Sequence, residues 1–531
     1  MTYAVDSPSS KRFYRPNVGT VLVAMLFLCA IALAACGSGP TSSNTTIKGG
    51  SISVGLVSEP QTLDPLKSVT LYDTDVMANM YDSLFQYDAQ NVIHPLLVSS
   101  YSYASPTVLN LTLHTGITFQ DGTPFNADAV LFNLNRFINN KASPRYSDVV
   151  SITSVQKVGA DQVQIILKQA YAPLLDKLTG QVGMMLSPAV VKKLGTKLGN
   201  APINAGSGAF TFVEWVKGDH VLLKANPHYW QKDAAGNALP YLQSVRFRAI
   251  TNTSVMYSNL QTNSIQIAST LGPSDVAQAK VNPSLNYRQV PGPGFESLQI
   301  NVSASPFNNV HVRRALAWGV DRKEIVSVAL KDTAVVSQGP LSPASWAFDK
   351  NFAGFSYDPA KAKAELAQAG MPDGFSFTLK IPGTSTTLLQ VAQLVQAELK
   401  AANITVTISQ ETFNALVTDF QTFNYQVLII GWTGGVDPDS TMYSMFTSTG
   451  GFNYTKYANA QLDSFLNQGR TTVDQAQRIP LYRQAQTVLV QDASRIFLYH
   501  PDVYQATTKS VKNYPLLASG VIQLTNVSLT S

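Results

Sequence analysis

The sequence predicts an α/β protein with at least two lobes. Strand patterns and helix patterns alternate along the chain from residue 51 onward. The chain has 531 residues, and single hydrophobic cores usually stop growing at about 250–300 residues. No repeat of fixed period and no low-complexity block interrupts the alternation.

Residues 1–35 are predicted to be a secretory signal peptide. A basic patch of Lys11, Arg12 and Arg15 precedes an uncharged apolar run, VLVAMLFLCAIALAAC. This run is shorter than the roughly 20 residues that a membrane-spanning helix needs. A retained membrane anchor is the alternative interpretation, because including residues 18–20 brings the run close to that length.

Cys36 closes the apolar run in the context Leu-Ala-Ala-Cys, which resembles the lipobox of bacterial lipoproteins. In those proteins the cysteine becomes the new N-terminus and carries acyl chains that hold the protein at a membrane. The alternative is that Cys36 is one more small apolar residue, like Cys29. Residues 36–49 consist of the cysteine followed mostly by small or polar residues, and they are expected to form a flexible spacer.

Composition restricts the possible functions of the mature chain. Cys36 would be its only cysteine, which excludes intramolecular disulfides and leaves no cysteine cluster for a metal. The formal charge of +5 loses three positive charges and one negative charge with residues 1–35, which leaves +3. Because this charge is small and scattered, we expect no nucleic-acid partner.

No catalytic pattern is recognisable. The chain has no Gly-Lys dipeptide, hence no Walker A loop, and neither H-E-x-x-H nor G-x-S-x-G. Asp437 and Asp439 could supply the two acids of a glycosidase, but acids flanking Pro438 are more typical of a turn. Six dispersed histidines lack an i, i+4 pair: His94, His114, His220, His228, His311 and His500. We therefore predict no catalytic residue, no metal site and no cofactor.

Periodicity predicts the elements in order along the chain. Strands are expected at 51–57, 108–114, 375–383, 403–409, 425–432 and 495–501, and helices at 126–139, 358–370, 388–402 and 473–493, with two further helices within 308–326, the second capped by Asp321. The β-α-β-β order from 375 to 432 implies a partly parallel sheet. Asn126 and Asp358 are predicted N-caps, Gly319 a break, and Gly370 a helix stop.

Several stretches together resemble one protein family. They are GLVSEPQTLDP, MYDSLFQYD, LTLHTGITFQDGTPFNADAV, GSGAFTFVEWVKGDHVLLKANPHYW, SLQINVSASPFNNVHVRRALAWGVDRKEIV, YDPAKAKAELAQAG and GWTGGVDPDS. In this order they resemble the family 5 extracellular solute-binding proteins of bacterial ABC importers, the dipeptide- and oligopeptide-binding type. The resemblance runs from about Gly50 to the C-terminus.

The resemblance implies a two-lobed periplasmic-binding-protein-like α/β fold with a hinge and an inserted subdomain in the first lobe. Lobe I would comprise 50–92, 205–298 and 496–531, the inserted subdomain 93–204, and lobe II 299–495. The lobes would close on a peptide or other small solute. A monomeric, lipid-anchored protein, exported to the outer face of the cytoplasmic membrane or the periplasmic space, would then deliver it to a permease powered by a separate ATPase.

Candidate ligand-binding residues cluster after the strand at 425–432. There a buried strand leads into a glycine-containing loop with Gly431, Trp432, Thr433, Gly435 and Asp437, where an aromatic ring could stack on a peptide or a sugar. The alternative is that Trp432 belongs to the core. Weaker candidates are Glu59, Tyr72, Phe295 and Trp346.

One departure from the family bears on the ligand. In peptide-binding relatives an aspartate a few residues after the tryptophan meets the α-ammonium of the peptide. Here residues 434–436 are Gly, Gly and Val, and the loop is one residue shorter. Asp437 could substitute, or it could only shape the turn before Pro438, in which case Glu59 is the next acid. An oligosaccharide or another solute without a free amine is therefore the alternative to a peptide.

Overall fold

The computed structural model describes residues 46–47 and 49–530. The predicted signal peptide, Cys36 and most of the spacer lie outside the described residues. Ile47–Leu529 forms one unit, and the description below concerns that unit. No helix in the described part of the chain is long and apolar enough to cross a membrane. Because the unit is not divided further, the predicted residue boundaries of the lobes stay predictions.

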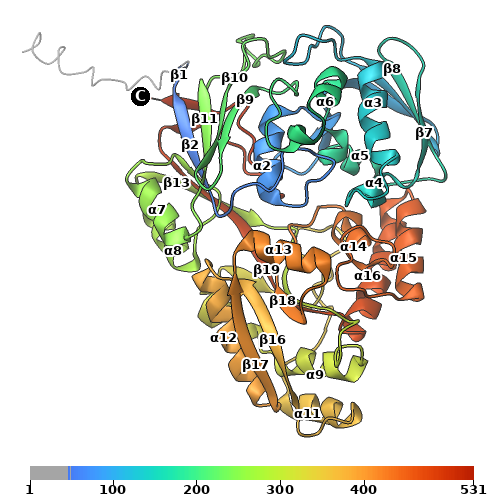
Figure 1. Cartoon of the computed structure of the whole chain (residues 1–531), viewed down its shortest axis with the longest axis vertical. Helices are drawn as coiled ribbons and strands as arrows, with labels where there is room; N and C mark the ends of the chain where they lie inside the picture. The colour runs from blue at the N-terminus through green and yellow to red at the C-terminus, as the bar shows by residue number, and fades with distance from the viewer. Residues whose placement is uncertain (1–45, 48, 531) are drawn as a thin grey trace, which may run out of the picture. The chain divides into compact units, whose positions relative to one another are not determined.

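One long strand, β19 (Arg495–Thr508), runs through both halves of a 12-stranded sheet (Figure 1). Its first part pairs with β14 (Glu296–Ile300) and β15 (Ala334–Val336). Its second part pairs with β13 (Leu285–Pro291) and β12 (Ile267–Ala268). The partners change between Pro501 and Asp502. This change divides the fold into lobe I, built on the second part of β19, and lobe II, built on the first.

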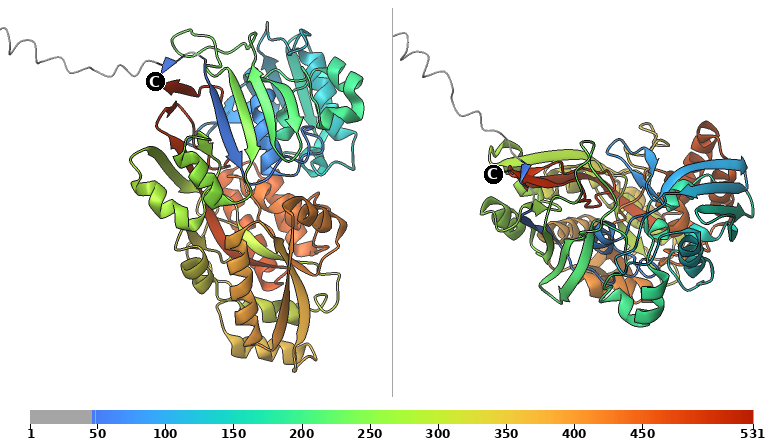
Figure 2. Two further views of the ribbon diagram at one scale, coloured as in Figure 1. Left: turned by 60° about the vertical axis from the view of Figure 1, so that its left-hand side comes forward. Right: turned by 90° about the horizontal axis from the view of Figure 1, so that it is seen from above.

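Lobe I is formed by the strand order β12-β2-β11-β10-β9 (Figure 2). Strand β2 (Ser51–Leu56) pairs in parallel with β11 (Ser244–Ala249) and β12, and β10 (His220–Ala225) pairs antiparallel with β11 and β9 (Phe210–Val216). Its helices are α2 (Leu71–Met80), α7 (Thr253–Gln261) and α8 (Pro273–Val281). Short strands β1 (Thr46–Ile47), β20 (Val511–Lys512) and β21 (Ser528–Thr530) lie near the chain ends. The alternating Ile52, Val54 and Leu56 are all buried, which confirms the strand predicted there.

A subdomain with its own hydrophobic core lies between β2 and β9 in the sequence. Its antiparallel sheet has the order β5 (Val98–Ser105), β6 (Val108–Leu113), β8 (Gln162–Leu167) and β7 (Ile152–Lys157). A hairpin of β3 (Phe85–Tyr87) and β4 (Ile93–Pro95) precedes it. Its helical segments are α3 (Ala127–Ile138), α4 (Tyr146–Val149), α5 (Leu174–Lys177), η1 (Gln181–Gly183), α6 (Pro188–Leu194) and η2 (Gly195–Gly199).

Lobe II contains the predicted β-α-β-β unit. Strand β16 (Phe375–Pro382) pairs in parallel with β17 (Ile404–Glu411) and β18 (Val427–Ile429), and α12 (Thr386–Lys400) connects β16 to β17. The remaining helical segments are α9 (Val310–Gly319), α10 (Arg322–Glu324), η3 (Ile325–Ala329), α11 (Pro359–Gln368), α13 (Phe413–Thr422), α14 (Pro438–Phe446), α15 (Ala460–Thr471) and α16 (Gln475–Gln491). The second helix predicted within 308–326 is capped by Asp321 as expected, but it is only the short α10 followed by the π-helical turn η3.

The predicted helix boundaries follow from local hydrogen bonds. The side chain of Asn126 accepts from the Ala129 N–H at 3.1 Å, and that of Asp358 accepts from the Lys361 N–H at 3.0 Å. Gly370 has φ +76°, the left-handed conformation that glycine tolerates best. These three boundaries confirm the sequence prediction.

Candidate functional site

Two cavities lie between the lobes. The large cavity has a volume of about 470 Å³ and the small cavity about 370 Å³. Both volumes fall in the range of small-molecule sites, about 300–1,000 Å³. The cavities share the lining residues Val69, Thr70, Leu71, Pro293, Trp432, Thr433 and Ser519. The two cavities therefore adjoin each other along these residues, and together we call them the interlobe groove.

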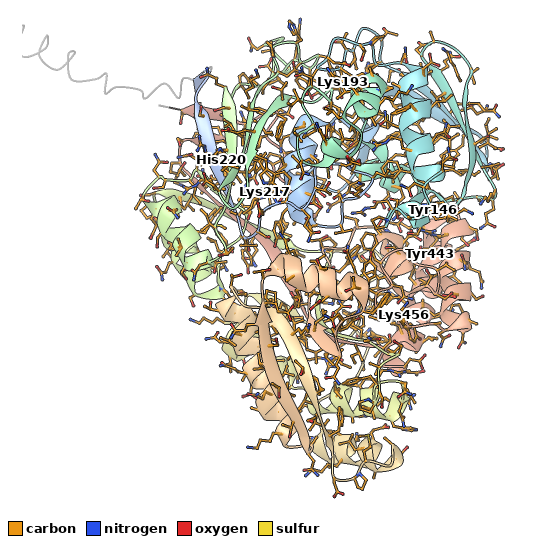
Figure 3. All side chains as sticks on the ribbon, viewed as in Figure 1. Tyr146, Lys193, Lys217, His220, Tyr443 and Lys456 are labelled. Atoms are coloured by element: carbon orange, nitrogen blue, oxygen red, sulfur yellow. The ribbon has the colours of Figure 1, made fainter. Side chains whose placement is uncertain are left out.

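Contacts between the lobes close this groove on opposite sides. On one side Tyr72 of α2 meets Phe413 of α13 edge to face, with ring centroids 5.5 Å apart. Nearby, the Gln61 side-chain amide donates to Asn414 Oδ1 at 3.1 Å. On the other side the subdomain meets lobe II, at the level where Figure 3 labels Tyr146 and Tyr443. The two lobes are thus in contact on both sides of the groove.

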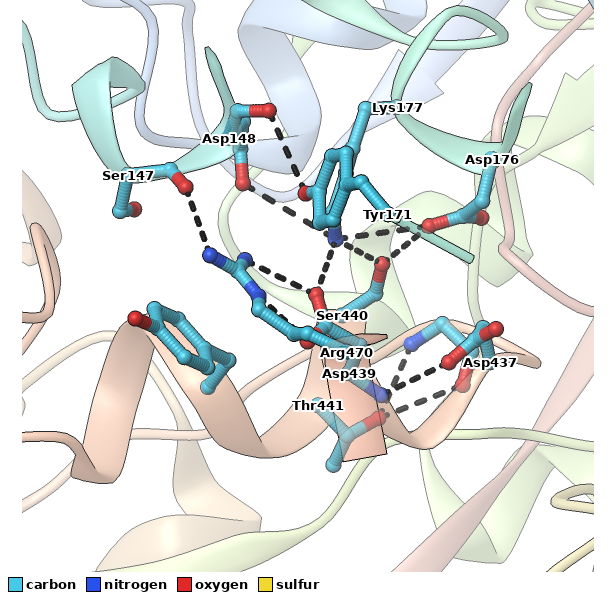
Figure 4. A network of polar contacts seen from close by, with 12 residues as sticks. Ser147, Asp148, Tyr171, Asp176, Lys177, Asp437, Asp439, Ser440, Thr441 and Arg470 are labelled. Carbon is cyan, nitrogen blue, oxygen red and sulfur yellow. Dashed lines mark hydrogen bonds and ion pairs between the residues drawn. The ribbon is translucent and has the colours of Figure 1, made fainter. Parts of the chain in front are cut away.

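A network of buried ions joins the subdomain to lobe II (Figure 4). Arg470 holds Asp439 with two hydrogen bonds of 2.7 and 3.0 Å, and Lys177 Nζ of the subdomain lies 3.3 Å from Asp439 Oδ2. Burial opposes the charge of Asp439, but Arg470 and Lys177 keep the pKa of its carboxyl below the usual value. Arg470 also donates to the Ser147 carbonyl at 3.1 Å, and Lys177 bonds to Ser440. These contacts favour the closed arrangement.

Trp432 stands at the junction of the two cavities. Its backbone exchanges two hydrogen bonds of 2.9 Å with Phe295, and its indole N–H donates to the Ser440 carbonyl at 3.2 Å. Its ring is tilted against that of Phe452, with centroids 5.0 Å apart. The indole is therefore held in place from behind and remains part of the groove wall. This position allows the stacking predicted for it.

Most of the predicted ligand-binding residues line the groove. A Cβ added at Gly431 would lie 2.9 Å from Glu296 Oε2, so the glycine leaves room for that carboxyl. The Phe295 side chain is fully buried beside Phe497, so Phe295 contributes mainly backbone to the wall. Trp432 and Thr433 line both cavities, Gly431, Tyr72 and Phe295 line the large cavity, and Gly435 lines the small one.

Glu59 and Trp346 line neither cavity. The Glu59 carboxylate accepts from the Trp215 indole and from the Gly218 N–H, both at 3.2 Å. Trp346 packs edge to face on Tyr482 at 5.9 Å within a core cluster of lobe II. Both side chains are engaged in these local contacts, and their ligand contact stays a prediction.

Asp437 also lies outside the lining of both cavities. Its side chain caps α14 by accepting from the Asp439 N–H at 2.9 Å. Arg478 donates two hydrogen bonds of 2.8 Å to the same carboxylate. With its oxygens used in this way, Asp437 is not free to meet an amine. Of the two roles left open by the sequence, the structure favours the turn and helix-capping role.

The groove also contains residues that the sequence analysis missed. The small cavity is lined by charged groups, Arg145, Asp148, Asp176 and Lys177. The large cavity is lined by Asp75, Glu296 and Asp502 together with many aromatic rings. The three acids of the large cavity come from segments about 200 positions apart, and the charged groups of the small cavity come from two separate helices, α4 and α5, and the residue before α4, so no local pattern groups them. No cluster of His, Cys, Asp or Glu in the described part of the chain could hold a metal ion.

Comparisons with known proteins agree with this architecture. The sequence model of the bacterial extracellular solute-binding proteins, family 5, matches residues 92–454. The "Glutathione-binding protein GsiB" of Pectobacterium atrosepticum is 28% identical over 483 residues, which cover 88% of this chain and 92% of the relative.

Solved structures show the same fold. DppA from Helicobacter pylori in complex with the peptide STSA superposes with a TM-score of 0.84 at 23% identity, covering 93% of this chain and 100% of the other. NikA from Staphylococcus aureus in complex with Ni(L-His)2 superposes with a TM-score of 0.80 at 19% identity, covering 91% and 100%. The predicted two-lobed α/β fold is confirmed. Because these two neighbours bind chemically different ligands, the fold alone does not identify the solute.

Proposed function

The chain belongs to the bacterial extracellular solute-binding proteins of family 5, and on this basis we propose that it captures a short peptide in the interlobe groove and delivers it to the permease of an ABC importer. Such a family assigns the chain a binding role and not a catalytic one. We further propose that the mature protein is a monomer tethered by acyl chains on Cys36 and located on the outer side of the cytoplasmic membrane.

The observation that carries the proposal is the closed groove itself. Its two cavities meet at Trp432 and are bounded by both lobes, so a solute held there would contact both lobes at once. Contacts to both lobes are what a ligand needs in order to stabilise the closed form over the open form. The peptide class is supported by the relatives, which are named for glutathione or solved with a peptide.

An oligosaccharide or another solute without an amine remains the second candidate. The observation in its favour is the missing acid at 434–436, since Asp437 is occupied by Arg478. Aromatic rings in the large cavity could stack on sugars.

A thermal-shift screen separates the two candidates. Di- to pentapeptides and α- and β-linked oligosaccharides are added to the purified protein, and native mass spectrometry identifies any solute retained from cells. A ligand at one hundred times its Kd should stabilise the folded protein by about 2.7 kcal/mol. Hits confined to oligosaccharides would replace the peptide proposal, and no hit in either class would contradict both.

Two tryptophan variants test the position of the site. Trp432→Ala should weaken binding of a hit about tenfold or more, because the ring forms the wall shared by both cavities. Trp346→Ala is the matched control, since Trp346 belongs to the same core cluster and lines neither cavity. Equal affinity losses in the two variants would indicate a general loss of packing and would contradict this site.

A further inference from the structure

The large cavity has an unusual combination of lining groups. Its rings come from both lobes and include Tyr72, Phe413, Phe420, Trp432, Tyr454 and Tyr499. Its ionisable acids are Asp75, Glu296 and Asp502, and no lysine or arginine is among the described residues that line it. A cavity with acids, aromatic faces and no basic side chain suits a cationic group.

Two of the three acids already have partners. Asp75 Oδ1 accepts from the Ile522 N–H at 3.0 Å, which ties it to the C-terminal segment. The Asp502 carboxylate accepts from the Gln289 side-chain amide on the neighbouring strand. Neither acid needs a ligand to satisfy its hydrogen bonds. Glu296 is therefore the remaining candidate.

Glu296 begins β14 at the point where the chain passes between the lobes. Its Oε1 is buried and has no hydrogen-bond partner in the described part of the chain. The carboxyl lies against Gly431, where an added Cβ would come within 2.9 Å of Oε2. Glu296 follows Phe295, the backbone partner of Trp432, so a solute at the indole is close to this carboxyl.

No lysine or arginine is among the described residues that line the cavity around Glu296. On α2, Tyr72 lies near both Glu296 and Asp75, and on β19 the register partner of Glu296 is Tyr499, followed by His500. His500 is buried, bonds to the Gly294 carbonyl, and has a pKa lowered to about 4 by burial, so it is neutral at physiological pH. Burial raises the pKa of the Glu296 carboxyl to about 8. A backbone hydrogen bond from Ser297 offsets part of the cost of burial, but a buried acid whose Oε1 is unsatisfied stays costly unless a partner arrives.

We propose that Glu296 anchors a primary ammonium group of the solute in the large cavity, on the opposite side of Trp432 from the shortened loop at 434–436. This inference rests on the proposed function, since it specifies the chemistry of the solute in the same groove. The arriving cation ionises Glu296, forms a charge-assisted hydrogen bond with Oε1, and faces the aromatic walls. The proton of Glu296 is released to solvent.

The ammonium could be the N-terminus of a peptide or a basic side chain. Four probes distinguish these sources: Ala-Ala-Ala, its N-acetylated form, N-acetyl-Lys-Ala-Ala and spermidine. Calorimetry gives Kd for each with wild type, Glu296→Gln and the control Glu59→Gln. The control Glu59→Gln makes the same chemical change at a residue that lines neither cavity. Because glutamine resembles the protonated carboxyl in shape and charge, Glu296→Gln is expected to fold, and circular dichroism checks this.

At least one probe with an amine should bind wild type, and Glu296→Gln should weaken it about 30-fold or more. Glu59→Gln should bind like wild type. From pH 6 to pH 7 wild-type affinity should rise about tenfold, because the ionised fraction of Glu296 rises tenfold while the amines stay charged. Binding at pH 7, measured in two buffers of different ionisation enthalpy, should release about one proton from wild type and none from Glu296→Gln.

The opposite results overturn the inference in distinguishable ways. In one case wild type binds the acetylated tripeptide as tightly as the free one, and Glu296→Gln binds the acetylated tripeptide equally well. The peptide function then stands and the ammonium anchor is refuted. If spermidine alone binds through Glu296, the anchor stands and the peptide function is refuted. If an amine probe binds wild type and Glu296→Gln equally, another group is the anchor. Absence of binding by every probe refutes the anchor.

Discussion

The pair formed by Asp437 and Arg478 gives the sharpest test of how the Trp432 loop is built. Replacing Asp437 with asparagine keeps a side-chain oxygen that can accept from the Asp439 N–H, so the cap of α14 is retained. The substitution removes the negative charge that receives two 2.8 Å hydrogen bonds from Arg478. The Arg478 side chain is 6% exposed, and that of Asp437 is 14% exposed.

The expected loss of folding stability depends on the hydrogen bonds that Arg478 keeps in the variant. Breaking a buried ion pair by removing one partner typically costs about 3–5 kcal/mol, because the other charge is left buried. Arg478 still donates to the Gly469 carbonyl and to the Tyr482 hydroxyl, both at 2.9 Å, so the lower end of that range applies. For about 480 residues unfolding together, the unfolding entropy is about 1 kcal/mol per kelvin, and Tm should fall by about 3 °C.

Differential scanning calorimetry measures this change. The matched control is Asp358→Asn, which removes a carboxylate from another N-cap that is followed by proline, at the start of α11. Because the Asp358 side chain is 33% exposed and pairs with the exposed Lys361, the control should lower Tm much less than Asp437→Asn does. Affinity for any peptide found in the screen should be the same in Asp437→Asn and wild type. A Tm within 1 °C of wild type combined with a large loss of affinity would refute the structural role argued here.

Three further outcomes are expected. Labelling with a palmitate analogue should mark wild-type cells and miss Cys36→Ser, and equal labelling of both would contradict the lipid anchor. The folded protein holds the proton of Glu296 with a pKa of about 8 against an ordinary value of 4.5, so it binds more protons than the unfolded chain between these values. The free energy of unfolding of wild type should therefore fall by about 3–5 kcal/mol more than that of Glu296→Gln as pH rises from 4.5 to 8, and parallel pH profiles would contradict the burial argument. Lys177→Met removes the 3.3 Å contact to Asp439 across the groove and should increase the radius of gyration of the ligand-free protein in X-ray scattering. Lys157→Met, which breaks the exposed pair with Asp128, should not, and an increase in neither variant would contradict the role of the ion network.

Local sequence patterns predicted individual elements well where the cause is local. The alternation Ile52, Val54 and Leu56 specifies a strand with one buried face, and the caps Asn126 and Asp358 make the hydrogen bonds expected of them. The loop at Trp432 was predicted as part of the site because a buried strand ends there in glycines. These features depend on neighbours within a few positions, which a sequence displays directly.

The site could be predicted only in part because its walls come from distant segments. Glu59 and Trp346 were selected as ligand-binding candidates by residue type and position in the sequence. In the structure Glu59 bonds to Trp215 and Trp346 packs on Tyr482, and no sequence spacing predicts either contact. The acid Glu296 was missed although its neighbour Phe295 was selected. Its importance arises because no lysine or arginine is among the described residues that line the large cavity and Oε1 is unsatisfied, which only the packed lobes reveal.

The sequence by itself determined the family, the α/β alternation and the position of the Trp432 loop, because each depends on residue order. Tertiary structure decided which charges face the solute. It places Asp437 against Arg478, 41 positions away, and leaves Glu296 Oε1, beside Gly431, without a hydrogen-bond partner in the described part of the chain. The physical reason is that the ionisation and bonding of a carboxylate are governed by what surrounds it within a few ångströms. In a groove between two lobes, those surroundings are assembled from the whole chain.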